Sequence, residues 1–174
     1  MIETIQTTNG ILALGGLATV IVAIFLIVDL TSKRIASSYI KTWGLHTAFF
    51  ATLSSVFFTL LYSEYFGIVP CGLCWFERIA LYPQLILLGI AIYYNDVVVP
   101  RSGIALSIFG LVISLYHHLI LMGGTTFIKC PASGADCAKR FFFEYGFMTF
   151  PLMAVFLFVF LIVIYIYILK TRPV

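Results

Sequence analysis

Five long apolar runs limit what this chain can fold into more than any other feature of its sequence. They cover residues 11–30, 45–66, 79–94, 104–122 and 147–169. A bilayer core is about 30 Å thick, and a helix needs about 20 apolar residues to cross it. With 62% hydrophobic residues, 10% charged residues and a mean hydropathy of +1.11, a soluble domain of this length would lack the polar cover it needs. We therefore predict an all-α integral membrane protein, a four-helix transmembrane bundle with an additional N-terminal transmembrane helix.

The first apolar run is open to two interpretations, a secretory signal or a retained helix. Residues 1–10 contain Glu3 and no Lys or Arg, whereas a signal peptide begins with a positively charged segment. Three basic residues follow the run instead, which favours a retained helix with its N-terminus outside the cytoplasm. We expect residues 1–42 to form an accessory helix with a cytoplasmic loop, and residues 43–174 to form a four-helix domain.

Four cysteines stand as two close pairs, Cys71 with Cys74 and Cys130 with Cys137. Two predicted spans separate the pairs, so both pairs must lie on the same side of the membrane. With the N-terminus outside, six of the ten basic residues fall in cytoplasmic segments, in the direction of the positive-inside rule. The cysteines then face the extracytoplasmic side of the plasma (inner) membrane, where disulfides persist. Two dithiol or disulfide couples on one surface indicate thiol–disulfide exchange.

The first pair has the surroundings that a reactive thiol needs. Only the thiolate attacks a disulfide, and a helix N-terminus or a nearby cation favours the thiolate. Cys71 and Cys74 lie at the predicted start of the third span, and Arg78 follows Cys74 by one helical turn. Pro83, inside the same span, predicts a kink. Glu77 is a candidate partner for Arg78 or a cap of the helix. A static disulfide in either pair and a four-cysteine zinc site are the alternatives.

The electrons of an oxidised dithiol need an acceptor. The chain contains no G-x-G-x-x-G fingerprint of a nucleotide cofactor, so a lipid-soluble quinone, ubiquinone or menaquinone, is the expected cofactor. His117 and His118 end the fourth span on the cysteine side and are candidates to bond a quinone oxygen, with His117 preferred. His46 is expected to be a structural polar residue. The basic residues are scattered, so they form no surface for binding nucleic acid. No bound metal is expected.

The stretch CGLCWFERIALYP, from Cys71 to Pro83, resembles the signature of the disulfide bond formation protein B family (DsbB), and is most similar to its short-looped, BdbC-like branch. In that family C-x-x-C-x-x-x-R begins a transmembrane helix, and a second cysteine pair lies in the last extracytoplasmic loop. The resemblance covers roughly residues 43–170. It implies a membrane enzyme that reoxidises an extracytoplasmic, DsbA-like thioredoxin-fold protein and passes the electrons to membrane quinone.

The resemblance also implies a role for individual residues. Cys74 would be the thiolate that interacts with the quinone, and Arg78 the cation of the quinone site. Cys130 would form the mixed disulfide with the partner protein, and Cys137 would pair with Cys130. The loop histidine of the family falls on His117 or its neighbour. The chain departs from the family in its extra N-terminal helix and in the short segment between its second pair of cysteines.

Three rival functions remain at the level of sequence. The vitamin K epoxide reductase type also couples a CxxC to a quinone, but its loop pair precedes the CxxC, whereas here it follows. A b-type haem carrier would need ligands from His46 and from His117 or His118, which lie at opposite ends of the predicted spans. A non-enzymatic subunit with static disulfides is the third. The order and position of the cysteines favour the DsbB-like interpretation.

Overall fold

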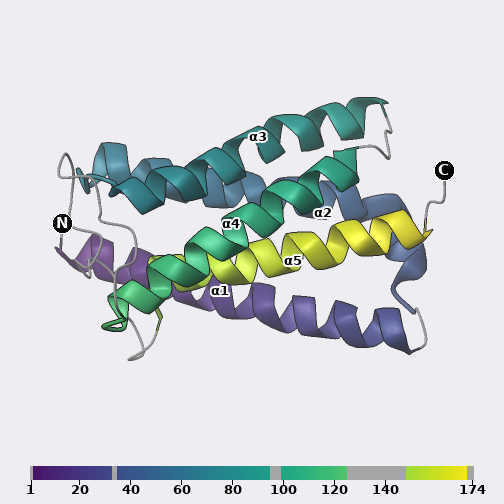
Figure 1. Cartoon of the computed structure of the whole chain (residues 1–174), viewed down its shortest axis with the longest axis horizontal. Helices are drawn as coiled ribbons and strands as arrows, with labels where there is room; N and C mark the ends of the chain where they lie inside the picture. The colour runs from purple at the N-terminus through teal and green to yellow at the C-terminus, as the bar shows by residue number, and fades with distance from the viewer. Residues whose placement is uncertain (1, 33–34, 95–98, 125–147, 172–174) are drawn as a thin grey trace.

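Five long helices run up and down through the structure, a computed structural model that describes residues 2–32, 35–94, 99–124 and 148–171 (Figure 1). They are α1 (Ile2–Thr31), α2 (Ser37–Leu60), α3 (Gly72–Tyr94), α4 (Val99–Leu121) and α5 (Phe150–Thr171), and a π-helical turn, Leu61–Tyr65, continues α2. Each of the five is long and apolar enough to cross a membrane. Helices suit that environment because they satisfy their own backbone N–H and C=O groups. The predicted fold class is confirmed.

The first four helices begin five to nine residues before the apolar runs that predicted them, whereas α5 begins three residues after the start of its run. Helix α3 begins at Gly72 rather than at residue 79, and it continues through Pro83. Hydropathy marks only the part of a helix that matches the lipid core, whereas the helix itself continues into the headgroup region. The expected boundary after residue 42 falls inside α2, and the division of the chain into two units stays a prediction.

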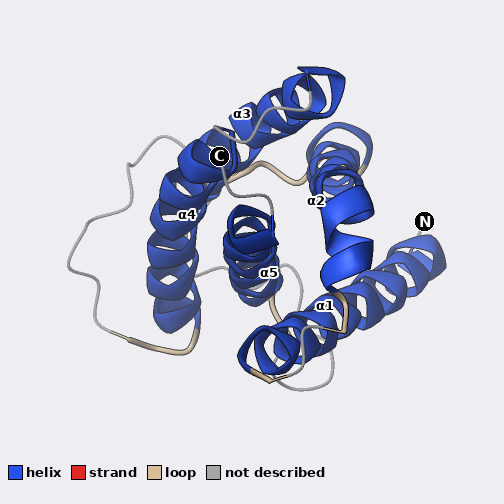
Figure 2. Cartoon of the chain, turned by 90° about the vertical axis from the view of Figure 1, so that its right-hand side faces the viewer, coloured by secondary structure: helices blue, strands red, loops and turns tan. Residues whose placement is uncertain are grey.

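Helix α5 lies in the middle of the bundle, in contact with α1, α2 and α4 (Figure 2). Glycines let α4 approach it closely. A Cβ at Gly103 would lie 2.6 Å from Cε2 of Tyr165, and a Cβ at Gly110 would overlap the ring of Phe158. Both rings are buried. Small residues at helix contacts are typical of membrane bundles, because close packing holds the helices together there.

A buried polar cluster joins α3, α4 and α5. The side-chain oxygen of Gln84 accepts hydrogen bonds from the hydroxyls of Ser107 and Tyr165, both at 3.1 Å. The amide nitrogen of Gln84 donates to the carbonyl of Ala80 at 2.9 Å. Each of these polar side chains therefore has a partner, and a satisfied network of this kind fixes the relative position of three helices.

Helix α1 is fastened at its C-terminal end by Asp29. Its carboxylate accepts the backbone N–H of Ile35 at 2.7 Å and that of Ala36 at 3.0 Å, just before α2 begins. The same carboxylate accepts the hydroxyl of Tyr167 on α5 at 2.6 Å. One buried side chain thus connects α1, the start of α2 and the end of α5.

A short turn between α2 and α3 positions the CxxC. Gly67 has a φ of 68°, in the left-handed region that favours glycine, and the N–H of Ile68 donates to the carbonyl of Tyr62 at 3.0 Å. A proline disfavours the α conformation in the residue before it, and Val69 accordingly lies outside the helix, so Pro70 favours a helix start after it. Cys71 therefore stands directly before the first residue of α3.

Candidate active site at the start of α3

Cys71 caps the N-terminus of α3 with its sulfur. The backbone N–H of Cys74 donates to Cys71 Sγ at 3.3 Å, and the carbonyl of Cys71 accepts the N–H of Trp75 at 3.2 Å. Serine and aspartate side chains cap helices in the same manner. Because a helix N-terminus favours negative charge, this position stabilises a thiolate.

Cys71 and Cys74 are both free thiols here, with their sulfur atoms at a hydrogen-bonding distance of 2.9 Å. The hydrogen bond from Cys74 is the largest influence on the pKa of Cys71. Together with the contact to His117 it lowers that pKa from 9.0 to about 4, against the opposing effect of burial. In the reduced pair, the hydrogen-bond donors therefore point to Cys71, which favours the thiolate there. The family resemblance had assigned the thiolate that faces the quinone to Cys74.

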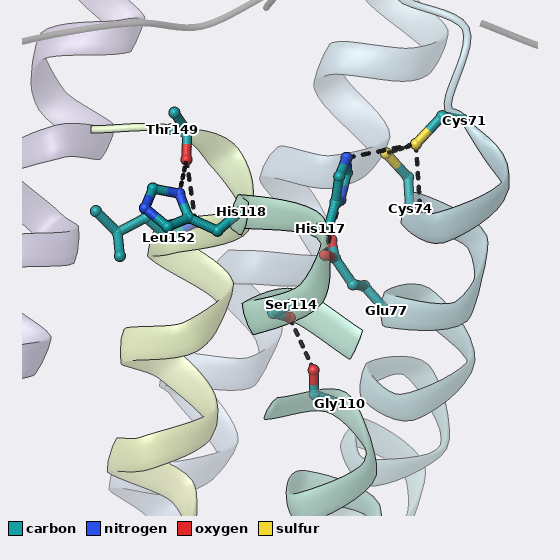
Figure 3. Close-up of polar contacts among 9 residues, drawn as sticks. All are labelled: Cys71, Cys74, Glu77, Gly110, Ser114, His117, His118, Thr149 and Leu152. Atoms are coloured by element: carbon teal, nitrogen blue, oxygen red, sulfur yellow. Dashed lines mark hydrogen bonds and ion pairs between the residues drawn. The ribbon is translucent and has the colours of Figure 1, made fainter. Parts of the chain in front are cut away.

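His117, near the end of α4, faces Cys71 (Figure 3). Its Nε2 lies 3.7 Å from Cys71 Sγ, and its Nδ1 lies 3.1 Å from Oε1 of Glu77. The carboxylate therefore holds the imidazole with Nε2 toward the sulfur. A nucleophile, a histidine and an orienting acid in this order form the arrangement that activates nucleophiles in many enzymes. Glu77, expected as a partner of Arg78 or as a cap, pairs with His117 instead.

Arg78 lies one turn beyond Cys74 on α3. Its Nη2 donates to the carbonyl of Thr59 on α2 at 3.0 Å, and its guanidinium lies 5.4 Å from the centre of the Trp75 ring. A cation above an indole face is stabilised by the ring. Within the described part of the chain, no carboxylate forms an ion pair with Arg78. An oxygen of a bound ligand is therefore a candidate partner for this charge.

A cavity of about 200 Å³ adjoins these side chains. Its charged and sulfur-bearing lining residues are Cys71, Cys74, Glu77, Arg78 and His117. The remaining wall is mainly apolar and includes Leu12, Phe58, Leu81, Leu121, Leu157 and Phe158. An apolar cavity of roughly 150 Å³ accommodates benzene, so this one has room for a substituted six-membered ring. A mainly apolar pocket with a few convergent polar groups is the usual form of a small-molecule site.

His118 points away from the cysteines (Figure 3). Its Nδ1 lies 3.0 Å from Oγ1 of Thr149, which also accepts the N–H of Leu152 at 3.3 Å and so caps α5. Among the described residues, the cavity wall includes His117 but not His118. This contact gives His118 a structural role, and its expected part in cofactor binding stays a prediction.

The haem alternative is disfavoured by the position of His46. That residue lies on α2, with 19 residues of helix between it and the end of the π-helical turn at Tyr65, or roughly 28 Å. His117 lies at the cysteine end of the bundle, beside Cys71. One haem iron cannot be reached by both imidazoles across this distance.

The ligand atoms of Cys71, Cys74 and His117 lie within 4.8 Å of one another, so they could hold a metal ion with a further ligand. Cys130 and Cys137, the second expected couple, lie outside the described residues.

Sequence reasoning missed the pairing of Glu77 with His117. No local signal could have found it, because 40 positions separate the two residues.

The fold and the site together define a class: a multi-pass membrane protein with a CxxC dithiol at the start of one span, beside a ring-sized apolar cavity. A sequence model of the family described as disulfide bond formation protein DsbB matches residues 41–167, and the chain belongs to this family. The predicted family is confirmed. No solved structure matches the chain.

Named relatives support the same assignment. Disulfide bond formation protein C of Bacillus subtilis (strain 168) is 34% identical over 116 residues, which is 66% of this chain and 84% of the relative. The SPbeta prophage-derived disulfide bond formation protein B of the same strain is 36% identical over 119 residues, 67% of this chain and 78% of the relative. A probable disulfide formation protein C 1 of Bacillus anthracis is 32% identical over 141 residues, 80% of this chain and 97% of the relative. The protein is therefore a membrane oxidoreductase of disulfide bond formation, of the BdbC-like kind.

Proposed function

We propose that the protein reoxidises an extracytoplasmic, DsbA-like thioredoxin-fold thiol oxidase and passes the electrons to a membrane quinone, either ubiquinone or menaquinone. One observation carries this proposal. The Cys71/Cys74 dithiol forms part of the wall of a cavity that suits a single substituted ring, and the guanidinium of Arg78 and the imidazole of His117 line the same cavity. No other electron acceptor is suggested by the sequence, which has no nucleotide fingerprint.

The residues present fit a quinone. The two oxygens of a quinone ring accept hydrogen bonds, and Arg78 in the cavity wall is a donor that would hold one of them, while His117 would act next to it as the proton carrier beside Cys71. The apolar wall suits the ring and the start of an isoprenoid tail. A bound quinone supplies an acceptor for two electrons and two protons. Glu77 keeps the imidazole of His117 oriented, so the histidine can hold or release a proton at Nε2.

The proposed transfer has three balanced steps. The dithiol of the partner protein is oxidised to a disulfide as the Cys130–Cys137 disulfide is reduced. That couple is reoxidised as the Cys71–Cys74 disulfide is reduced. The Cys71/Cys74 dithiol then returns to the disulfide, and its two electrons and two protons would pass to the quinone to give the quinol.

Disulfide exchange accounts for both thiolate assignments. When a thiolate attacks one sulfur of a disulfide, the other sulfur leaves as a thiolate. If the second couple attacks Cys71, Cys74 is the sulfur that is released beside the cavity. When both thiols are reduced, Cys71 holds the negative charge, since the hydrogen-bond donors point to it. The two cysteines would therefore carry the thiolate in turn.

An anaerobic assay with purified protein tests the proposal. Reduced thioredoxin-fold substrate is supplied with ubiquinone-1 or menadione, and quinone reduction is followed by absorbance. The native protein should reduce at least one of them, and Cys74→Ser should abolish the activity, while Trp43→Phe at the other end of the bundle should retain it. Normal quinone reduction by Cys74→Ser would refute the mechanism.

We also propose that both cysteine couples face the extracytoplasmic side of the cell membrane. The positive-inside distribution of Lys and Arg supports this orientation. In intact cells that carry a variant with all four native cysteines replaced by serine, a membrane-impermeant maleimide should label a single cysteine introduced in the 125–129 segment and should not label one introduced at position 96. The reverse pattern would overturn the orientation.

A further inference from the structure

Helix α1 lies outside the part of the chain that the family model matches, which begins at residue 41. It nevertheless contributes to the cavity beside the cysteines, because Leu12 forms part of the cavity wall. We propose that α1 forms one wall of the quinone site. In this wall, Leu12 and Asn9 determine the affinity of the site for quinone and its selectivity between quinone rings. This inference rests on the proposed function and adds determinants of ligand selection to it.

The first support is the hydrogen bond between Asn9 and Tyr62. The hydroxyl of Tyr62 donates to Oδ1 of Asn9, and both side chains are buried. Tyr62 itself lines the cavity. Its ring packs edge-on against Phe150, another residue of the cavity wall, with ring centres 4.8 Å apart. Asn9 therefore positions a cavity side chain from a helix that the family model does not cover.

The second support is the close approach of α1 to α5. A Cβ at Gly16 would lie 3.3 Å from Cγ of Met153, and Met153 lines the cavity. Ala13 is fully buried and packs in the same apolar cluster as Met153. Small residues at positions 13 and 16 thus let α1 lie directly against the cavity side of α5.

The third support is that α1 is fastened at both ends. Asp29 bonds to Tyr167 near one end, and Asn9 bonds to Tyr62 near the other. A helix held at two points presents Leu12 at a fixed position, whereas a loosely attached helix would leave that side of the cavity open to lipid. Because a packed wall resists added volume, a larger side chain at position 12 should exclude ligand.

The test measures quinone binding separately from turnover. The chain has two tryptophans, so a Trp43→Phe background leaves Trp75, beside Arg78, as the fluorescent reporter. Quenching by ubiquinone-1 and by menadione gives Kd, and the anaerobic assay gives KM and kcat. In this background Leu12→Phe is compared with Leu14→Phe, a matched change two residues along at a side chain that is 60% exposed.

We expect Leu12→Phe to raise Kd and KM about tenfold with little change in kcat, and Leu14→Phe to leave all three within about twofold. Leu12→Ala enlarges the cavity, so it should lower the Kd for the bicyclic menadione relative to the Kd for ubiquinone-1. Asn9→Leu should raise Kd about threefold or more, and Asn9→Asp, which keeps an acceptor oxygen for Tyr62, should restore much of the loss.

The outcomes separate this inference from the function on which it rests. If the native protein binds and reduces quinone but Leu12→Phe and Leu12→Ala behave like Leu14→Phe, then α1 does not form part of the site. If the native protein neither binds nor reduces either quinone, the proposed function fails and this inference fails with it. Melting temperatures in detergent identify any variant that does not fold, in which case the remaining position-12 variant decides.

Discussion

Nε2 of His117 lies 3.7 Å from Sγ of Cys71, although 46 positions separate the two residues in the chain. The contact joins the end of α4 to the start of α3. It places an imidazole, oriented by Glu77, beside the sulfur that caps a helix. The thiolate of Cys71 is thus held by a side chain from one helix and by the backbone of another.

Removing the imidazole should make the Cys71 thiolate harder to form. A hydrogen bond to a charged group contributes about 1.5–3 kcal/mol, so His117→Leu should raise the pKa of Cys71 by roughly one to two units. Glu77→Leu should raise it by less, because the imidazole remains but loses its orienting partner. Site-resolved alkylation of the reduced protein across pH measures both. His46→Leu serves as the control, and an unchanged pKa in His117→Leu would contradict the geometry.

The pH dependence of the reduced protein follows from the same sulfur. The hydrogen bond from Cys74, aided by His117, lowers the pKa of Cys71 from 9.0 to about 4. Thiolate absorbance at 240 nm should therefore persist at pH 6 and disappear with a midpoint near 4, and Cys71→Ser should lack this step. Because folding lowers the pKa, the thiolate stabilises the reduced fold fully above about pH 9, and this contribution declines with falling pH until it is lost near 4. A midpoint near 9 would refute the assignment.

The contact of Asp29 with Tyr167 should hold α1 in the bundle. Tyr167→Phe removes the hydroxyl, and Asp29→Asn weakens the acceptor, so each should lower the melting temperature in detergent. The two effects should add only in part, because both changes weaken the hydrogen bond between Asp29 and Tyr167, whereas Asp29→Asn also weakens the bonds from Ile35 and Ala36. Tyr93→Phe is the matched control, since that ring is 82% exposed. Fully additive losses would show that the two residues act independently.

Because α4 packs closely against α5, we expect the stability cost of replacing a glycine to depend strongly on its position. Gly103→Ala would place a methyl 2.6 Å from the ring of Tyr165, and overpacking of this kind costs about 1–3 kcal/mol of unfolding free energy. Gly89→Ala is the control, since its Cβ would meet only Phe49 at 3.7 Å. There the helix propensity of alanine should leave stability equal or slightly higher. Unfolding in mixed micelles compares the two, and equal losses would contradict the packing.

Local patterns in the sequence predicted the spans and the start of the reactive helix. Apolar runs of membrane length identify helices because lipid permits few other spanning structures. The CxxC was expected at or just before the start of the third span, where it lies, although α3 begins seven residues earlier than its apolar run, and the position of His117 at the end of its run placed it near the cysteines. These inferences use spacing along one helix or the alternation of helices across the membrane, both of which the sequence contains.

Contacts between distant side chains could not be predicted in the same way. Glu77 has Arg78 as its neighbour in sequence, yet it pairs with His117 on another helix. Asn9 bonds to Tyr62, and Asp29 to Tyr167 across 138 positions. Each contact depends on the rotation of a helix about its axis, which the weak amphipathicity of a membrane span does not specify.

The sulfur cap of α3 also links electron transfer to backbone order. When Cys71 is anionic, its Sγ is a strong acceptor for the amide of Cys74; once oxidised, the same atom is neutral and holds that amide weakly. Each turnover should therefore loosen and re-form the first turn of α3, and amide exchange at position 74 should differ between the two redox forms. The order of the backbone at this rim of the bundle would then depend on the redox state of the site.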